Sequence, residues 1–283
     1  MSEKLVLLAR AKINLTLDVL GKRPDGYHQV EMVMQNISLA DTIILEKTPG
    51  DVSISCSHPE VPENEDNLAY RAAMALKLVE SYAGGVKIHI DKRIPVAAGL
   101  AGGSSNAAAV LIGLNRLWSL GLSREHLMHI GSTLGSDVPF CILGGTALAR
   151  GRGEEITPLK AVPELTLVLV KPPFGVSTAQ VYGNFRQEKV ANRPDTRAML
   201  QAIEAGDSAA IIRLGANVLE SVTLELHPQV AEIKDRLTQA GAKGVLMSGS
   251  GPAVFGFVED ENQGREVAGR LADLGSTYVA KTC

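Results

Sequence analysis

The segment PVAAGLAGGSSNAAAVL, residues 95–111, groups small residues that could bind an anion. Gly99, Gly102 and Gly103 let the backbone approach an oxyanion without a Cβ in the way, and Ser104 and Ser105 add hydroxyl donors. A helix that begins here would direct free N–H groups and its positive dipole end toward that anion. The segment predicts a phosphate-binding loop; a glycine-rich helix start needed only for close packing is the alternative.

Two familiar phosphate loops do not fit this segment. A Walker A loop requires a lysine and then Ser or Thr after its last glycine, whereas Ser104 directly follows Gly103. The dinucleotide pattern G-x-G-x-x-G fails because Gly99 and Gly102 are three residues apart.

The segment 95–111 has no charged residue, so a cation or a base that acts on a bound phosphate must come from other segments. In AKINLTLDVL, residues 11–20, apolar and polar residues alternate, so Lys12 and Asn14 share one face of a predicted strand. Asp137 lies in LGSDVPF, where glycine and proline indicate a turn. Lys12 could neutralise phosphate charge and Asp137 could accept a proton, while a solvated lysine and a helix-capping aspartate are the alternatives.

An aromatic pair follows the first strand. The loop GKRPDGYH ends in Tyr27 and His28, which offer a stacking face and a hydrogen bond to a pyrimidine edge. Tyr182, in STAQVYGNF, is a second candidate for stacking, with a half-buried packing role as the alternative.

Composition excludes several classes of protein. The net charge of −3 over 283 residues predicts no broad attraction to nucleic acid or to an anionic membrane. The longest apolar runs, such as LTLVLV, are too short to span a bilayer, and the first residues do not form a secretory signal. Cys56, Cys141 and Cys283 are far apart, which favours reduced thiols in a cytoplasmic protein of undetermined oligomeric state.

The elements that must position these residues follow from periodicity and from turn residues. The first half predicts strands at 4–20, 29–38, 41–47, 51–56, 85–91, 141–149 and 155–159, and helices from Asp66 or Asn67 to Gly84, from Ser104 or Ser105 to Gly121, and over 123–134. The second half predicts strands at 165–170, 244–248, 253–258 and 277–281, with helices within 195–223, at 228–241 and near 261–274. Its order, β-α-β-β-α-β with the first α doubled, predicts a ferredoxin-like unit.

Four segments, in chain order, together resemble the GHMP kinases, the superfamily that includes galactokinase, homoserine kinase, mevalonate kinase and phosphomevalonate kinase. They are AKINLTLDVLGKRPDGYH, PVAAGLAGGSSNAA, LGSDVPF and MSGSGPAVFGF. The GGSSNAA ending is similar to one branch, whose acceptor carries a cytidine diphosphate group. The resemblance implies an α+β fold of two domains, 1–158 mixed α/β and 159–283 ferredoxin-like, with the active-site cleft between them.

The resemblance also implies an ATP-dependent small-molecule kinase of isoprenoid precursor biosynthesis that uses Mg²⁺ and phosphorylates a hydroxyl of a cytidine diphosphate sugar-alcohol. Asp137 would be the catalytic base and Lys12 its paired cation, with Ser105 as a magnesium ligand. The residues implied to bind ATP are Pro95, Val96, Ala97, Ala98, Gly99, Leu100, Ala101, Gly102, Gly103, Ser104, Ser105, Asn67 and Lys92. The residues implied to bind the acceptor are Asn14, Tyr27, His28, Tyr182, Gly249, Ser250 and Gly251.

Two other functions stay open on the sequence. One is a GHMP kinase with a different acceptor, of the homoserine or mevalonate type, which has no use for stacking tyrosines. The other is a non-catalytic nucleotide-binding module, which needs the glycine loop but not Lys12 or Asp137. The loop also carries Ala98 and Ala101 where many relatives have other small residues, and alanine should be tolerated at these positions if φ is negative there.

Overall fold

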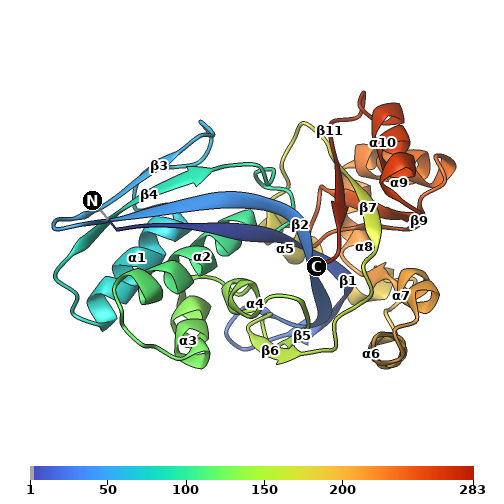
Figure 1. Cartoon of the computed structure of the whole chain (residues 1–283). Coiled ribbons are helices and arrows are strands. Elements are labelled where there is room, and N and C mark those ends of the chain that lie inside the picture. The colour runs from blue at the N-terminus through green and yellow to red at the C-terminus, as the bar shows by residue number, and fades with distance from the viewer. Residues whose placement is uncertain (1–2) are drawn as a thin grey trace. The chain divides into compact units, whose positions relative to one another are not determined.

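The computed structural model describes residues 3–283, which form two compact units (Figure 1). The first unit takes residues 3–11, Leu39–Val96 and Ala101–Gly144, and the second takes Lys12–Ser38, Ala97–Leu100 and Gly145–Cys283. Each unit is built from separate chain segments, because the long strands β1 (Lys4–Lys22) and β2 (His28–Thr48) each contribute residues to both units. The predicted domain boundary at 158 stays a prediction. The glycine-rich segment crosses between the units twice.

The first unit packs helices against strands. Beside its parts of β1 and β2 it contains β3 (Val52–Cys56), β4 (Gly85–Asp91), α1 (Leu68–Val79), α2 (Gly102–Leu117), α3 (Arg124–Leu134) and α4 (Val138–Leu143). Strand β4 pairs antiparallel with β2 and parallel with β3. Alternate residues of β2 and β4 are buried, so Ile43 and Ile88 pack in one core with Leu76 of α1 and Leu111 of α2.

The second unit contains the rest of the large sheet. There β8 (Ala216–Asn217) pairs parallel with β1, β5 (Thr146–Arg150) pairs antiparallel with β2, and β6 (Glu155–Pro158) pairs with β5.

A separate four-stranded antiparallel sheet follows in this unit, in the order β11-β7-β10-β9. Its strands are β7 (Thr166–Lys171), β9 (Lys243–Met247), β10 (Val254–Val258) and β11 (Ser276–Lys281). Strand β10 lies between β7 and β9, which is the split arrangement that the β-α-β-β-α-β order predicts. The ferredoxin-like prediction is therefore confirmed.

The helices of the second unit lie between or beside these strands. They are α5 (Thr178–Asn184), α6 (Thr196–Ala205), α7 (Ser208–Leu214), α8 (Glu220–Leu226), α9 (Pro228–Gln239) and α10 (Glu261–Arg270), with a 3₁₀ turn at Gln187–Lys189. Asp195, Asp207 and Asp260 cap α6, α7 and α10 through their carboxylates.

Several predicted elements differ from the structure. Residues 138–143 form helix α4 and not the start of a strand, because Pro139 occupies its first turn, where proline favours a helix. The helical region 195–223 is divided by Gly206, which ends α6 at a positive φ, and by the short strand β8. The strands predicted at 29–38 and 41–47 are one continuous strand, β2.

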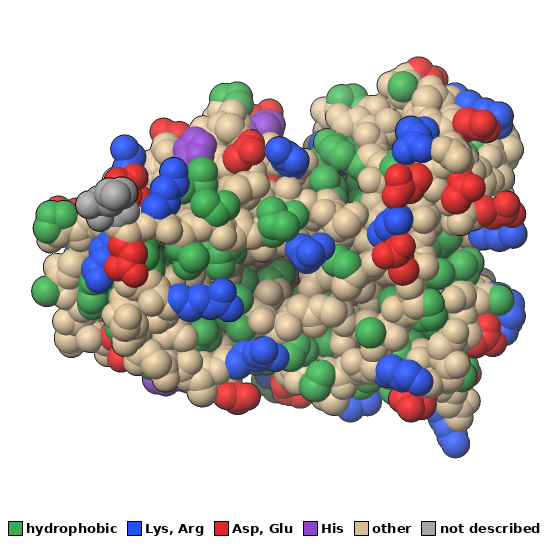
Figure 2. Space-filling view, viewed as in Figure 1, with side chains coloured by type: hydrophobic (Ala, Val, Ile, Leu, Met, Phe, Trp, Pro, Cys, Tyr) green, Lys and Arg blue, Asp and Glu red, His purple; other side chains and the backbone are tan. Residues whose placement is uncertain are grey.

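The surface agrees with the small net charge. On the face shown in Figure 2, Lys and Arg side chains are interspersed with Asp and Glu side chains over both units. Among residues 3–283, no helix has both the length and the apolar character that a bilayer crossing requires.

Candidate active site

In the glycine-rich loop, residues with positive φ alternate with residues outside the positive-φ region. Ala97, Gly99 and Ala101 have φ of 51°, 76° and 55°, whereas Ala98 and Leu100 between them are not in the positive-φ region. Positive-φ residues that alternate with other residues are typical of backbone concavities that bind anions. The condition for tolerating alanine without strain is therefore met at Ala98 and not at Ala101.

Left-handed backbone costs an alanine about 1–2 kcal/mol relative to glycine. The loop therefore holds Ala97 and Ala101 in a strained conformation, which is common where backbone groups bind a ligand.

Helix α2 begins directly at this loop, at Gly102 and not at Ser104 or Ser105 as predicted. Gly102 and Gly103 therefore lie in the first turn of the helix, although glycine is a poor helix former, and Ala101 is the last residue before it. Ala101 is the N-cap and provides no side-chain hydrogen bond, so the first N–H groups of a 16-residue helix have no side-chain cap. This helix end is electrostatically suited to a phosphate.

The two serines of the loop have different environments. Ser105 is 3% exposed and its Oγ donates to the carbonyl oxygen of Arg10 at 2.7 Å. The role of Ser105 as a magnesium ligand stays a prediction, and its hydroxyl is buried and bonded to Arg10 in this structure. Ser104 is only partly buried, and a Cβ built at Gly135 would lie 3.7 Å from its Oγ. Ser104 thus lies beside the LGSDVPF segment.

Asp137 occupies the N-cap position of α4, yet its side chain makes no capping hydrogen bond. Its carbonyl oxygen accepts from the backbone N–H of Cys141 at 3.1 Å, which is the helical bond. Asp137 therefore occupies the capping position, but its carboxylate does not serve as the cap. Asp137 belongs to the first unit and Lys12 to the second, so their pairing stays a prediction.

Lys12 is a buried cation in the second unit. It is 4% exposed, and its Nζ donates to Oδ1 of Asn14 at 2.7 Å and to the carbonyl oxygen of Gly99 at 3.1 Å. The surface-lysine alternative is therefore wrong. Lys12 and Asn14 share one face of β1, as the alternation predicts, and the structure shows that Lys12 on this face contacts the glycine loop.

The SGSG segment packs against the same loop. The hydroxyl of Ser248 donates to the carbonyl oxygen of Gly99 at 3.0 Å, and the N–H of Ala253 donates to the carbonyl of Ala98 at 3.3 Å. A Cβ on Gly249 would lie 3.3 Å from Nζ of Lys12, so glycine brings this backbone close to the ammonium. The two glycine loops and Lys12 form one cluster.

Asn217 and Thr178 support this cluster, and the sequence analysis did not identify either. The amide of Asn217 donates to the carbonyls of Met247 and Gly249 at 2.9 and 2.7 Å, and the hydroxyl of Thr178 lies 2.9 Å from that of Ser250. No signal marks them in the sequence, because both act through long-range contacts.

The predicted aromatic residues come from two distant segments. The rings of His28 and Tyr182 lie 5.3 Å apart between centroids, and Phe185 approaches His28 edge-on at 6.4 Å. Tyr27 is 55% exposed, and the guanidinium of Arg152 lies 5.0 Å from its ring centroid. Phe185, which contacts His28, and Arg152, which contacts Tyr27, were not identified from the sequence.

The imidazole of His28 favours its neutral form. Burial lowers its pKa below the ordinary value, and the nearby positive charge of Lys22 lowers it further. At pH 7 the ring therefore has one donor and one acceptor nitrogen, as recognition of a pyrimidine edge requires.

Asn67 and Lys92 have structural partners in the first unit. Asn67 caps α1 by accepting from the N–H of Ala69 at 2.9 Å, and its amide donates to the carbonyl of Pro62 at 2.7 Å. Nζ of Lys92 forms an ion pair with Asp41 at 2.7 Å. Their roles in ATP binding stay predictions, and the ammonium of Lys92 is already paired.

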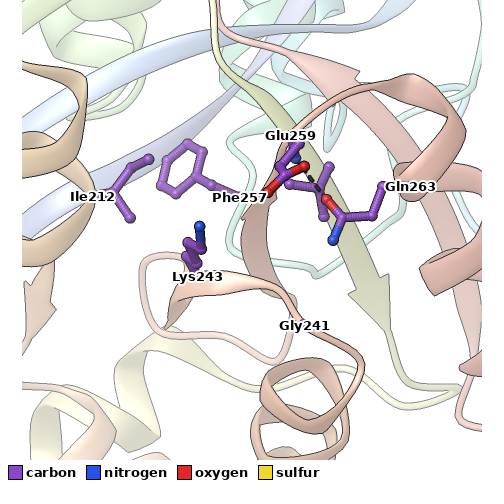
Figure 3. Close-up of a pocket in the computed structure, with 7 residues that line it drawn as sticks. Ile212, Gly241, Lys243, Phe257, Glu259 and Gln263 are labelled. Carbon is purple, nitrogen blue, oxygen red and sulfur yellow. Dashed lines mark hydrogen bonds between the residues drawn. The ribbon is translucent and has the colours of Figure 1, made fainter.

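A separate open pocket lies in the second unit (Figure 3). It is lined by Ile212, Gly241, Lys243, Phe257, Val258, Glu259 and Gln263. None of the residues predicted for the active site lines it, so we do not assign it to that site.

Comparison with known proteins agrees with this arrangement. Residues 67–145 match the family described as GHMP kinases N terminal domain, and residues 199–277 match GHMP kinases C terminal. A protein of Brevibacillus brevis named 4-diphosphocytidyl-2-C-methyl-D-erythritol kinase is 56% identical over 89% of this chain and 87% of its own length. A protein of the same name from Exiguobacterium sibiricum is 53% identical over 98% of this chain and 97% of its own.

Solved structures show the same likeness. A crystal structure of 4-(cytidine 5'-diphospho)-2C-methyl-D-erythritol kinase is similar with a TM-score of 0.84 and 37% identity, over 98% of this chain and 99% of that one. Homoserine kinase from Cytophaga hutchinsonii has the same fold, with a TM-score of 0.78 at 18% identity, over 100% of this chain and 95% of its own. The matched domains and the relatives, together with the loop and helix start described above, show that the chain belongs to the GHMP kinase family.

Proposed function

We propose that this kinase transfers the γ-phosphoryl group of ATP to the 2-hydroxyl of 4-diphosphocytidyl-2-C-methyl-D-erythritol, in the methylerythritol phosphate pathway to isoprenoid precursors. The relatives that share more than half of its residues over most of its length bear the name of this kinase. The observation that carries the proposal is the loop at 97–101. Its residues alternate between positive φ and other conformations, and it leads directly to the start of α2, which has no side-chain cap.

The reaction needs positioning and charge neutralisation more than covalent catalysis. The acceptor oxygen forms a bond to the γ-phosphorus, the bond from that phosphorus to the β,γ-bridging oxygen breaks, and ADP leaves. The hydroxyl proton passes to the Asp137 carboxylate, which no capping bond occupies. The ammonium of Lys12 stabilises the developing negative charge.

The loop and the start of α2 would hold the triphosphate oxygens through backbone N–H groups. Mg²⁺ would neutralise phosphate charge, with ATP oxygens and water supplying most of its ligands. Within residues 3–283, no three His, Cys, Asp or Glu side chains form a metal-binding group. Ser105 stays our candidate for a protein ligand, and the partly buried Ser104 is a second candidate.

The aromatic group suits the cytosine of the acceptor. Neutral His28 offers hydrogen bonds to the base edge, while Tyr27 and Tyr182 offer stacking faces. Replacement of both rings, Tyr27→Ala and Tyr182→Ala, should raise KM for the cytidyl acceptor about 10- to 100-fold, at about 1–3 kcal/mol per stacked base. KM for ATP should stay near its original value in the same steady-state assays. An equal rise in both KM values would contradict an acceptor-specific role.

Acceptor choice provides the direct test of the function. The protein is incubated with ATP, Mg²⁺ and, in separate reactions, the cytidyl acceptor, homoserine or mevalonate, and ADP release is measured. We expect ADP release to depend on the cytidyl acceptor. Release that follows homoserine or mevalonate would identify another member of the family, and ATP binding without turnover on any acceptor would identify a nucleotide-binding module.

A further inference from the structure

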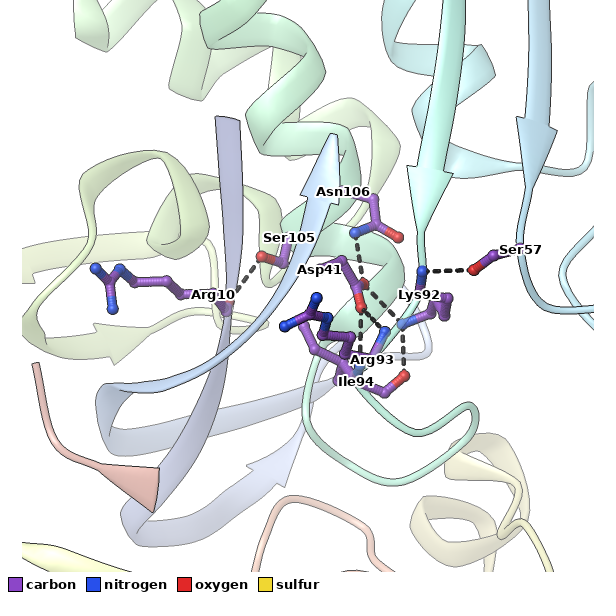
Figure 4. A network of polar contacts seen from close by, with 8 residues as sticks. All are labelled: Arg10, Asp41, Ser57, Lys92, Arg93, Ile94, Ser105 and Asn106. Atoms are coloured by element: carbon purple, nitrogen blue, oxygen red, sulfur yellow. Dashed lines mark hydrogen bonds and ion pairs between the residues drawn. The ribbon is translucent and has the colours of Figure 1, made fainter. Parts of the chain in front are cut away.

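A fully buried carboxylate in the first unit has no role in the chemistry above. Asp41, on β2, is 0% exposed. Its Oδ1 accepts from the N–H groups of Arg93 and Ile94, both at 2.7 Å, and its Oδ2 accepts from Nζ of Lys92 at 2.7 Å and from Nδ2 of Asn106 at 2.8 Å (Figure 4). Four donors therefore converge on one side chain.

These donors flank the phosphate loop on both sides. Residues 92–94 directly precede Pro95, and Asn106 directly follows Ser105. The Asp41 carboxylate is therefore bonded to the chain before the loop and to the helix after it. The bond from Ser105 to the carbonyl of Arg10 attaches the same helix turn to β1. The separation between the two ends of the loop is thus set by the Asp41 side chain on β2 and by the backbone carbonyl of Arg10 on β1.

The same carboxylate positions a cation under the helix start. A Cβ on Gly102 would lie 3.1 Å from Nζ of Lys92 and 3.2 Å from Cγ2 of Ile94. The ammonium therefore lies against the first residue of α2, with its charge balanced by the Asp41 carboxylate. Its further bond, to the carbonyl of Ile94 at 2.6 Å, keeps it close to the loop.

Burial makes this arrangement sensitive to the loss of any partner. An ion pair taken out of water is stable only if its remaining hydrogen-bonding groups are satisfied, and removal of one partner leaves an uncompensated buried charge. The side chains of Lys92 and Asp41 are 5% and 0% exposed, so solvent does not replace a lost partner.

We propose that Asp41 is a positioning residue for nucleotide binding: through Lys92, Asn106 and the backbone of 93–94 it fixes both ends of the phosphate loop in the geometry that receives the triphosphate. The proposal rests on the proposed function, because it requires that the loop binds ATP. It assigns to Asp41 an effect on affinity for ATP and not on the chemical step.

Asn106→Ala is the sharpest test, because it removes one hydrogen bond and keeps the ion pair. Asn115→Ala is the matched control: Asn115 is also on α2, and its amide bonds to the N–H and carbonyl of Leu122 at 2.9 and 3.0 Å, at the helix end away from the loop. We measure Kd for ATP by calorimetry, KM and kcat, and the melting temperature.

Asn106→Ala should weaken ATP binding about 3- to 10-fold, the value of one buried hydrogen bond, while kcat at saturating ATP stays close to that of the original protein. Asp41→Asn should weaken it further, about 10- to 100-fold, because it also breaks the buried pair. Asn115→Ala should lower the melting temperature without changing Kd.

An unchanged Kd for ATP in Asn106→Ala, with a melting temperature lowered as in Asn115→Ala, would show a purely structural role and overturn the proposal. If Asp41→Asn does not fold, Asn106→Ala decides alone. ATP binding by the original protein distinguishes failure of this proposal from failure of the proposed function. If the original protein binds no ATP, the assignment of the loop fails. If it binds ATP and Asn106→Ala binds ATP equally well, only the role of Asp41 is rejected.

Discussion

Asp137→Asn is expected to lower kcat about 10²- to 10⁴-fold, the usual contribution of a positioned general base. The amide has the size of the carboxylate but cannot accept the proton of the attacking hydroxyl. Affinity for ATP should change little, since the loop and the start of α2 supply the phosphate contacts. Steady-state kinetics with the cytidyl acceptor and a separate binding measurement for ATP distinguish these two effects.

A folding defect should not account for the loss of kcat in Asp137→Asn. The Asp137 side chain makes no capping bond, and asparagine is as favourable as aspartate at an N-cap, so the melting temperature should be unchanged. Asp207→Asn is the matched control, because Asp207 is an N-cap whose side chain does accept from Ala210 and lies outside the predicted site. A kcat for Asp137→Asn within about tenfold of that of the Asp207→Asn control would remove Asp137 as the base.

Gly99→Ala is expected to destabilise the protein by about 2–4 kcal/mol, from backbone strain together with overpacking. Gly99 has φ of 76°, and a Cβ there would lie 2.2 Å from the carbonyl oxygen of Ser248. That oxygen belongs to the backbone and cannot move away as a flexible side chain would. The melting temperature should fall by roughly 5–10 °C, and ATP binding should weaken because the loop is displaced.

Gly103→Ala provides the control for the stability measurement. Gly103 lies in α2, without a positive φ, and a Cβ there would meet only Cδ1 of Leu68, at an ordinary contact distance of 3.5 Å. Alanine in a helix is more favourable than glycine, so this variant should melt at the same temperature or higher. Equal melting temperatures for the two variants would mean that Gly99 is not conformationally required.

The sequence identified most of the local structure that surrounds the loop. Alternation placed Lys12 and Asn14 together on one strand face, and they bond to each other at 2.7 Å. Asn67 and Ser123 were expected at helix starts and cap α1 and α3. These features depend on residues close in the chain, so spacing and side-chain chemistry are sufficient to predict them.

Other parts of the fold depend on competition between local preferences. The positive φ of Ala101 runs against the preference of alanine, and the surrounding chain imposes it. Likewise Gly102 and Gly103 are poor helix formers on their own, yet both lie in α2. Local propensity cannot predict such residues, because packing at a distance supplies the energy that overrides it.

By itself, therefore, the sequence predicted a phosphate loop and determined the strand face of Lys12, the ferredoxin-like order of the second half and the resemblance to the family. Only the tertiary structure decided that Asp41 joins both ends of that loop and that Ser105 is buried against Arg10. It also decided that β1 and β2 each contribute residues to both compact units. The physical reason is that these contacts join residues tens of positions apart, and their partners are fixed by how β1, β2 and α2 pack and not by any short pattern.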